Sequence, residues 1–504
     1  MSELLNENPR PFIEMAKLAY ERKDYVKVCE CLQSLIKLDS TKPEYFSGLA
    51  IAQKKLKKFD DAEINYLNAL KIKSSFWEAS YNLGLLLQEK GEVEQAIKFY
   101  NAAIESNPAL YLAYYNLGNA YREKEMFSDA ILYYSKAIDA KKDFSDAYYN
   151  LGVVYEHLFD FENALQNYEF AIKYEPNHIY AHWNKSLLLL LKGDYQNGFE
   201  EFEWRLLRKE SVKRNFMKPK LTNLKITGKK VYVYCEQGLG DTIQFVRFLS
   251  DLKKLGGFLI FEVDPLLINL FSGLNYIDEL VPRLSLDEPI VDYDYQISLL
   301  SLPKLFRATI GTIPSDTPYL QTDLNKMKHW NDELAVEYLK VGIAWAGNPN
   351  HSRDKMRSVS LNRFEKIAGI NSLKLFSLQI GEASKEINEV NFDIKDLSSF
   401  GMNDFSDTAA VISNLDLVIT VDTSVAHLAG AIGKETWLLL PYFPDWRWML
   451  ERTDTPWYPS LKLFRQPKPG DWDTVFQNVM DELKFMCHIE GACLSGRQGR
   501  RNDK

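Results

Sequence analysis

The sequence predicts a helical repeat array followed by a parallel α/β region. The first half of the chain repeats itself every 34 residues, a period typical of stacked helix-turn-helix units. Near residue 212 this helical periodicity gives way to short apolar runs separated by turn residues, which are typical of buried strands. Amphipathic stretches lie between those runs, and this alternation favours parallel strands joined by helices.

The repeats share a Tyr-Asn-Leu-Gly motif that begins at Tyr81, Tyr115 and Tyr149. In a helix pair, a glycine at this position lets the two helices approach closely, and a large ring from the second helix fills the crossing. The expected glycines and rings are Gly84, Gly118 and Gly152 with Tyr100, Tyr134 and Tyr168. The pattern resembles the tetratricopeptide repeat and predicts about six repeats over residues 9–210, the last of them degenerate.

Composition excludes several functional classes. The net charge of −8 argues against a nucleic-acid partner. Five cysteines form no paired framework and no metal motif, so we expect a cytoplasmic protein without a structural metal. The sequence contains no apolar run long enough for a membrane span, and the N-terminal segment does not resemble a signal peptide.

Six apolar runs are candidate strands: Lys230–Cys235, Phe258–Val263, Val341–Ala346, Leu373–Leu378, Leu415–Val421 and Trp437–Leu440. We expect them to form two halves, residues 229–325 and 326–487, after a linker over residues 211–228. The polar stretch 321–338 suits a helical connection between the halves. The glycine-containing, basic tail over residues 488–504 is predicted to be disordered.

The first chemical motif follows the first predicted strand and reads Glu-Gln-Gly-Leu-Gly-Asp-Thr-Ile-Gln from Glu236. Its glycines turn the chain into a helix whose first N–H groups suit an anion or a sugar hydroxyl. The alternative is a plain strand-to-helix turn with Asp241 as a capping residue. The candidate binding residues of this loop are Gln237, Gly238, Gly240, Thr242 and Gln244.

The second motif follows the strand at Leu415–Val421 and brings Asp422, Thr423 and Ser424 to a sheet edge. The small-residue helix that follows presents N–H groups, and together with the two hydroxyls these suit a phosphate. His427 lies one turn into this helix, where it can donate to the same anion. The alternative for His427 is a structural role on an apolar helix.

These two motifs, together with Asp445-Trp-Arg-Trp448 and Trp457-Tyr-Pro459, resemble the heptosyltransferase-like family of glycosyltransferases, family nine, in its tetratricopeptide-fused branch. The resemblance implies a GT-B fold of two Rossmann-like halves, with the acceptor on the first half and a nucleotide-sugar on the second. It also implies inverting transfer without a metal ion or a cofactor. Heptosyltransferases of lipopolysaccharide synthesis carry no repeat array, so the resemblance alone does not assign their lipid-linked acceptor to this chain.

Matched to the family motifs, Asp241 corresponds to the general base, which takes the proton of the acceptor hydroxyl. Asp422, Thr423, Ser424 and His427 correspond to the loop that holds the donor phosphates. Arg357 falls in a family-like region of the second half and is expected either at the phosphates or in a surface salt bridge.

The asparagine of the repeat motif recurs at Asn82, Asn116, Asn150 and Asn184. Carboxamides at fixed spacing can bind the backbone of an extended peptide. The layout is similar to that of O-GlcNAc transferase, in which an asparagine ladder lines the repeats ahead of a GT-B module. The alternative is that asparagine is simply common at this repeat position.

The sequence therefore predicts a glycosyltransferase that moves a sugar from a nucleotide-sugar to a hydroxyl of a protein recruited by the repeats. Relatives with fused repeats make flagellin the leading specific acceptor. Two alternatives remain: an enzyme acting on a polysaccharide or lipid-linked glycan, with the repeats used for assembly, and a non-catalytic repeat scaffold.

Overall fold

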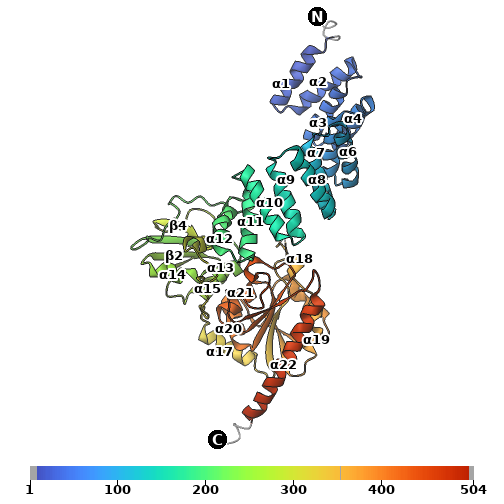
Figure 1. The fold of residues 1–504 in the computed structure, drawn as a ribbon. Coiled ribbons are helices and arrows are strands. Elements are labelled where there is room, and N and C mark those ends of the chain that lie inside the picture. The colour runs from blue at the N-terminus through green and yellow to red at the C-terminus, as the bar shows by residue number, and fades with distance from the viewer. Residues whose placement is uncertain (1–7, 352, 499–504) are drawn as a thin grey trace. The chain divides into compact units, whose positions relative to one another are not determined.

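The structure is a computed structural model that describes residues 8–351 and 353–498, and its chain divides into two compact units between His182 and Trp183. Figure 1 shows the helix pairs of the first unit and the sheets and helices of the second. Among the described residues, no helix has both the length and the apolar character needed to span a membrane.

The first unit is a tetratricopeptide solenoid of consecutive helix pairs, as the period predicts. The second helix of each pair packs on the first helix of the next pair. The helices are α1 (Arg10–Glu21), α2 (Tyr25–Leu38), α3 (Pro43–Lys55), α4 (Phe59–Ile72), α5 (Trp77–Glu89), α6 (Val93–Ser106), α7 (Tyr111–Glu123), α8 (Phe127–Ala140), α9 (Ser145–His157) and α10 (Phe161–Tyr174).

The expected glycine–tyrosine crossings are present in the solenoid. A Cβ placed on Gly84 or Gly118 would lie 2.6 Å from the ring of Tyr100 or Tyr134, closer than real side chains come. The tyrosine hydroxyls are also satisfied, for example by the 2.8 Å bond that Tyr100 donates to Gln88 Oε1. The crossing therefore requires a very small residue opposite a fully packed ring.

A second backbone feature repeats at the turn between the two helices of each pair. One residue there is left-handed, with φ between 57° and 87°. Only glycine adopts this conformation without steric cost, yet the six positions are Lys23, Lys57, Gly91, Glu125, Phe159 and Gly193. Four of the six turns are therefore built at some cost to stability.

The sixth helix pair completes the predicted array, although most of it belongs to the second compact unit. Helix α11 (Ile179–Leu191) contains the division between the units, and α12 (Tyr195–Phe202) packs on the α/β region. Trp457 Nε1 donates to Tyr195 Oη at 3.0 Å, and the ring of Phe199 meets Trp446 at 5.8 Å. These aromatic contacts pack the last repeat on the α/β region.

The predicted linker over residues 211–228 is also part of the second unit rather than a free connection. Leu221 and Ile226 are buried, and Lys220 forms a parallel bridge with Gln296. A short 3-10 turn, η1 (Glu203–Leu207), precedes this segment. The buried apolar residues of the segment pack it on the α/β region.

The second unit contains two parallel sheets, which confirms the predicted α/β class. The first has the order β3-β2-β1-β4, from β1 (Lys230–Tyr234), β2 (Phe258–Val263), β3 (Glu279–Pro282) and β4 (Tyr295–Ser298). The second has the order β10-β9-β8-β5-β6-β7, from β5 (Leu339–Ala344), β6 (Leu373–Ser377), β7 (Ile394–Asp396), β8 (Leu417–Val421), β9 (Thr436–Leu440) and β10 (Leu461–Arg465). When the strands are renumbered from one within each half, the first sheet has the order 3-2-1-4 and the second has the order 6-5-4-1-2-3. Both match the strand order of doubly wound sheets.

Helices cover the sheets and connect the halves. The connection predicted near residues 321–338 contains α17 (Leu324–Glu333), which packs on α20 (Phe405–Asn414). The remaining α-helices are α13 (Leu239–Phe245), α14 (Phe248–Lys254), α15 (Ile268–Phe271), α16 (Leu302–Leu305), α18 (Asp354–Arg357), α19 (Glu365–Ala368), α21 (Ser424–Ala431) and α22 (Trp472–Gln498). The short 3-10 segments are η2 (Pro265–Leu267), η3 (Leu299–Ser301), η4 (Leu361–Phe364), η5 (Glu382–Glu389), η6 (Ser398–Phe400) and η7 (Trp446–Trp448).

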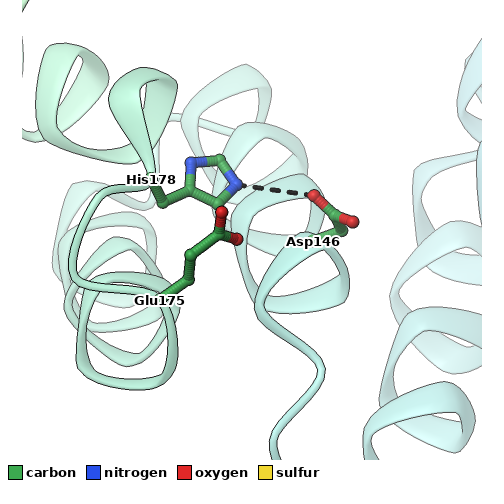
Figure 2. A group of neighbouring side chains, drawn as sticks. All are labelled: Asp146, Glu175 and His178. Atoms are coloured by element: carbon green, nitrogen blue, oxygen red, sulfur yellow. Dashed lines mark ion pairs between the residues drawn. The ribbon is translucent and has the colours of Figure 1, made fainter.

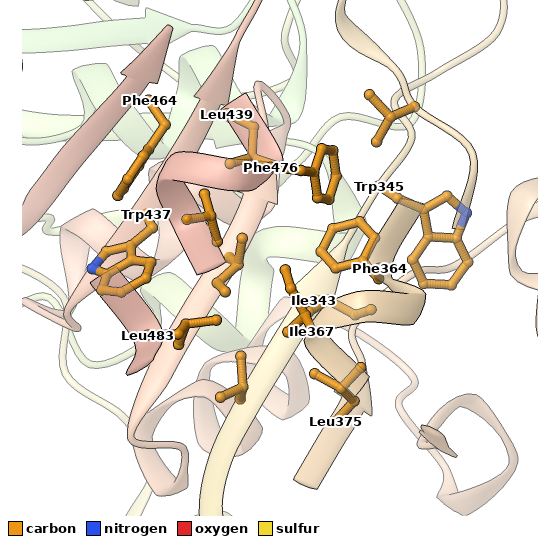
Figure 3. Packing of buried hydrophobic residues seen from close by; sticks show 14 of the residues in the cluster. Ile343, Trp345, Phe364, Ile367, Leu375, Trp437, Leu439, Phe464, Phe476 and Leu483 are labelled. Atoms are coloured by element: carbon orange, nitrogen blue, oxygen red, sulfur yellow. The ribbon is translucent and has the colours of Figure 1, made fainter. Parts of the chain in front are cut away.

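The core of the second half lies between its sheet and α22. Figure 3 shows Phe476 and Leu483 of this helix packed against the sheet residues Ile343, Trp437 and Leu439. Helix α22 continues to Gln498, within the tail of residues 488–504 that the sequence predicts to be disordered. Residues 499–504 lie outside the described chain.

Candidate functional site

The candidate site lies at the carboxyl edge of the six-stranded sheet, where β5 and β8 are neighbours and the strand order reverses. Ligands of open parallel sheets bind at such a switch point. Asp422 follows β8 directly, and Thr423 is the N-cap of α21. Thr423 Oγ1 accepts from the N–H of Val425 at 3.3 Å, so its hydroxyl has a structural task as well. Ser424 opens the helix and is half-buried.

Asp422 lies close to a second carboxylate, that of Asp445. Burial, followed by the charge of Asp445, raises the pKa of Asp422 to about 6, against the opposing effect of Arg357. Burial acts in the same direction on Asp445, but Arg447 outweighs it and lowers the pKa of that carboxyl. Asp422 thus gains or loses its proton near neutral pH at the edge of the site.

His427 is buried and uncharged. Burial, followed by the charge of Arg447, lowers its pKa to about 3. Its Nδ1 lies 2.9 Å from the hydroxyl of Tyr458, and its ring stacks on Trp448 with a centroid distance of 5.4 Å. The expected contact with an anion would therefore come from a neutral imidazole, as a hydrogen bond without ionic attraction.

The two sequence motifs meet directly. Helix α13 of the first half packs on α21 of the second, and a Cβ on Gly240 would lie 2.8 Å from the His427 ring. This close approach explains why glycine occupies position 240. The loop that follows β1 and the N-terminal part of α21 therefore lie against each other.

Asp241 joins the two halves through an ion pair. Its Oδ1 accepts from Arg447 Nη2, and its Oδ2 accepts from the N–H of Gly238 at 3.0 Å. The capping alternative is thus realised in the structure. Each oxygen of the predicted general base thus accepts one hydrogen bond, which leaves a lone pair on each oxygen for a further donor.

Arg447 is the residue around which the site is organised. It is buried, with Nε donating to Gln244 Oε1 at 2.6 Å and Nη1 donating to Asp445 Oδ1 at 2.8 Å. Burial lowers the pKa of Arg447, but Asp445 and Asp241 outweigh this effect and raise it. The guanidinium also lies over the ring of Trp446 at 4.4 Å.

The other loop residues have varied surroundings. Thr242 Oγ1 donates to the carbonyl of Gly238 at 3.2 Å, and Gln237 is half-buried. Gln244 is fully buried, and its Nε2 has no hydrogen-bond partner among the described residues. Nη2 of the buried Arg247 is likewise unpaired within the described chain. Buried donors without partners suit a site that binds an oxygen-rich ligand.

Arg357 is the last residue of α18, and its guanidinium lies over the loop that follows β5 rather than on the open surface. Its Nε lies 3.3 Å from Asp354 Oδ1, and its side chain is only 18% exposed. The guanidinium covers the backbone of Gly347, where a Cβ would collide with it. It also lowers the pKa of Asp422 against the effect of burial, so its charge reaches the switch point.

The asparagines of the repeats bond to the array itself. Asn116 Nδ2 donates to Tyr81 Oη at 3.0 Å, and Asn150 Nδ2 donates to Tyr115 Oη at 2.8 Å and Asn119 Oδ1 at 3.2 Å. Asn150 is 6% exposed, which corrects its expected place as a free groove ligand. Its two amide hydrogens are already used. Asn82 is half-buried, and Asn184 belongs to the second unit.

A third cluster lies in the first unit, where Asp146, Glu175 and His178 have ligand atoms within 4.8 Å of one another (Figure 2). His178 Nδ1 accepts from the N–H of Ala181 at 3.1 Å, and Nε2 lies 3.5 Å from Asp146 Oδ1. A neutral histidine bonded in this way carries its proton on Nε2 and has no lone pair there for a metal. The cluster thus matches a helix cap whose histidine lies beside the carboxylate of Asp146.

Several site residues were missed as individual predictions. Glu236, Arg447 and Tyr458 stand inside the quoted motifs, but no role was assigned to them. Arg447 and Asp241 are 206 positions apart, so no local pattern connects them. The one available signal was charge within an aromatic-rich segment, which favours a buried and therefore paired arginine.

Comparisons with known proteins identify the repeats. A family model described as tetratricopeptide repeat matches residues 145–178, and one described as TPR repeat matches residues 86–124 and 118–158. Protein FlbA of Caulobacter vibrioides (strain ATCC 19089 / CIP 103742 / CB 15) is 26% identical over 283 residues, which cover 51% of this chain and 47% of FlbA. The chain thus matches about half the length of that relative.

Solved structures similar to this chain cover the repeats. MamA is 26% identical, with 32% of this chain and 95% of MamA covered and a TM-score of 0.31. A tetratricopeptide repeat protein from Parabacteroides merdae ATCC 43184 is 18% identical, with 40% of this chain and 80% of that chain covered and a TM-score of 0.36.

Proposed function

We propose that the chain is a glycosyltransferase that moves a sugar from a nucleotide-sugar to a protein hydroxyl. The observation that carries the proposal is the meeting of two doubly wound halves at Asp241, Arg447 and His427. A bound nucleotide-sugar at the β5–β8 switch point would lie beside the loop that follows β1. This arrangement suits transfer from a donor on one half to an acceptor on the other.

The donor side has the groups that a diphosphate requires. The N-terminus of α21 presents N–H groups beside Ser424, and Arg357 supplies a cation over the loop that follows β5. As the bond to the sugar breaks, negative charge grows on the phosphate, and a fixed cation with N–H donors stabilises that charge. We assign this task to Arg357 and α21, and we propose transfer with inversion and without a metal ion.

The acceptor is proposed to be a protein held by the repeats, with flagellin as the specific candidate. Tetratricopeptide arrays present extended surfaces that commonly bind proteins. Half-buried Asn82 is the best placed of the four asparagines for such contacts. Asn116 donates a hydrogen bond to Tyr81, and both amide hydrogens of Asn150 are used by bonds within the array.

The test is nucleotide release from UDP-, GDP-, ADP- and CMP-linked sugars, with purified flagellin as acceptor and mass spectrometry of the product. We expect release with one donor class and a matching mass increase on flagellin. Release without protein modification would favour a glycan acceptor, which is the alternative reading. Absence of release from every donor, with and without flagellin, would favour a scaffold.

A further inference from the structure

Arg205 lies in η1, directly after the last repeat helix, and its side chain reaches the carboxyl edge of the first sheet. The side chain is 2% exposed. Its Nη2 donates to Ser298 Oγ at 2.9 Å and to Ser301 Oγ at 3.0 Å, where β4 ends. Both Nε and Nη2 donate to Glu236 Oε1, at 3.0 and 2.8 Å. Because Glu236 follows β1 by two residues, the arginine joins the ends of two neighbouring strands.

The donors of Arg205 are all engaged. Nη1 donates to Glu203 Oε1 at 2.7 Å and to the carbonyl of Phe202 at 3.1 Å, both at the end of the last repeat. The arginine is therefore held by the repeat and itself holds Glu236. The other carboxylate oxygen, Glu236 Oε2, is buried without a hydrogen bond among the described residues. Loss of Arg205 would thus leave Glu236 without a hydrogen-bond donor from the described chain.

The backbone fixed at Glu236 leads directly to the predicted base. Gly238, two residues further on, donates its N–H to Asp241 Oδ2 at 3.0 Å. The orientation of that carboxylate thus depends on where the Gly238 backbone lies, and Glu236 fixes the chain just before it. Arg447 of the second half binds the other oxygen, Asp241 Oδ1. The loop after β1 is therefore held by Arg205 at its start and by Arg447 at its end.

Stability alone is a poor reason for a buried pair such as Arg205 and Glu236. Removing two charges from water costs about as much as their attraction returns, and apolar residues often serve equally well. The same sheet offers a comparison in Arg214 and Glu262, whose side chains are 4% and 5% exposed. Arg214 binds Glu262 and the carbonyl of Asp287, neither of which belongs to the loop after β1. What distinguishes Arg205 is the segment that it holds.

We propose that Arg205 is a positioning residue of the transferase, which acts through Glu236 and Gly238 on the carboxylate of Asp241. The proposal rests on the transferase function proposed above, with Asp241 as its base. In the step, the acceptor oxygen bonds to the anomeric carbon and releases its proton to Asp241. The bond from that carbon to the nucleotide phosphate breaks, and its electron pair leaves with the nucleotide. The base must lie within hydrogen-bond reach of the hydroxyl, so a small displacement of the loop is costly.

The test compares Arg205→Lys with the matched control Arg214→Lys in the full chain. Lysine keeps the buried positive charge but lacks the rigid fork that directs two donors to one oxygen. We expect kcat for nucleotide release from the active donor, with flagellin present, to fall about 10²-fold in Arg205→Lys, the cost of a shift of about 1 Å. The dissociation constant of the free nucleotide, measured by calorimetry, should stay unchanged. Arg214→Lys should lose stability as well but keep the wild-type kcat.

Glu236→Gln separates positioning from the need for a charge. Glutamine keeps an oxygen that accepts from Nε and Nη2 of Arg205, so kcat should stay near the wild-type value. Glu236→Leu removes the hold and should lower kcat as Arg205→Lys does, and it decides the matter if Arg205→Lys does not fold. A wild-type kcat in folded Arg205→Lys overturns the proposal. Equal losses of kcat in Arg205→Lys and Arg214→Lys also overturn it, because the loss would then follow stability.

Failure of the proposed function would look different. If the wild type binds no nucleotide and releases none from any donor, the transferase function fails and the role of Arg205 fails with it. If the wild type releases nucleotide and Arg205→Lys releases it equally fast, only the positioning role fails.

Discussion

The carboxylate of Asp241 and the guanidinium of Arg447 form an ion pair across 206 positions of the sequence. One residue follows the first strand of the first half, and the other follows β9 of the second half. The pair is largely buried and continues through Asp445 and Gln244. The pair therefore holds the N-terminal part of α13 against the segment that contains Trp448, whose ring stacks on His427.

Replacing Arg447 with methionine should destabilise the protein strongly. The change leaves Asp241 and Asp445 without their cation, and breaking a buried pair costs about 3–5 kcal/mol. The measurement is the free energy of unfolding in denaturant. Arg452→Met is the matched control, because its pair with Asp454 is exposed and worth about 0–1 kcal/mol. Equal losses in the two variants would contradict the account.

The left-handed turns predict a stabilising substitution. Lys57 has φ of 59°, and glycine removes the steric cost of this conformation, as Gly91 does at the same position of the next repeat. We expect Lys57→Gly to raise the free energy of unfolding by about 0.5–1 kcal/mol. Lys98→Gly, in the middle of α6, should lower it by about 1 kcal/mol. A loss of stability in both variants would argue against strain at the turn.

The repeat asparagines should separate into structural and exposed members. Asn150→Ala removes bonds to Tyr115 and Asn119 in a buried setting, so we expect a loss of about 1–3 kcal/mol in thermal unfolding. Asn82→Ala should leave stability nearly unchanged, because no bond of its side chain to the described residues is seen. If Asn150→Ala left stability unchanged and lowered only sugar transfer to the protein acceptor, Asn150 would bind the peptide, as the ladder interpretation holds.

Acid should destabilise the protein through His427. Its folded pKa of about 3 lies below the unfolded value near 6.5, so the unfolded chain binds the proton more tightly between these limits. The stability that neutral His427 contributes is present above about pH 6.5 and is lost as pH falls toward 3, by up to about 5 kcal/mol. His427→Gln should flatten this part of the stability profile relative to the wild type.

Two comparisons isolate the His427 effect. His329→Gln, at an exposed position of α17, should follow the wild-type profile. Asp422 acts in the opposite sense, because its raised pKa of about 6 stabilises the fold at low pH and loses that contribution as pH rises through 6. Parallel profiles for wild type and His427→Gln would contradict a buried neutral imidazole.

Sequence periodicity predicted most of the fold because it records burial. The 34-residue period placed the helix pairs, and all six apolar runs became strands. The strands β3, β4, β7 and β10 were missed. The first three are short and partly exposed, and β10 alternates with a lysine, so none makes an apolar run.

The candidate site was predictable only in its local parts. The motifs placed Asp422 at the end of a strand, and Asp241 and His427 near the start of the helices that follow strands, where the structure has them. Their partners come from distant segments, as with Arg447 for Asp241 and Arg205 for Glu236. Pairing between charges so far apart depends on the packing of the two halves, which a single sequence does not display.

The most direct test of the transferase account is nucleotide binding at the β5–β8 switch point. Thermal unfolding is measured with UDP, GDP, ADP, CMP and their sugar conjugates for the wild type, Arg357→Gln and the surface control Arg363→Gln. At 100 times its dissociation constant a ligand stabilises the fold by about 2.7 kcal/mol. The account predicts a shift with one nucleotide class, kept in Arg363→Gln and lost in Arg357→Gln. No shift with any nucleotide would contradict it.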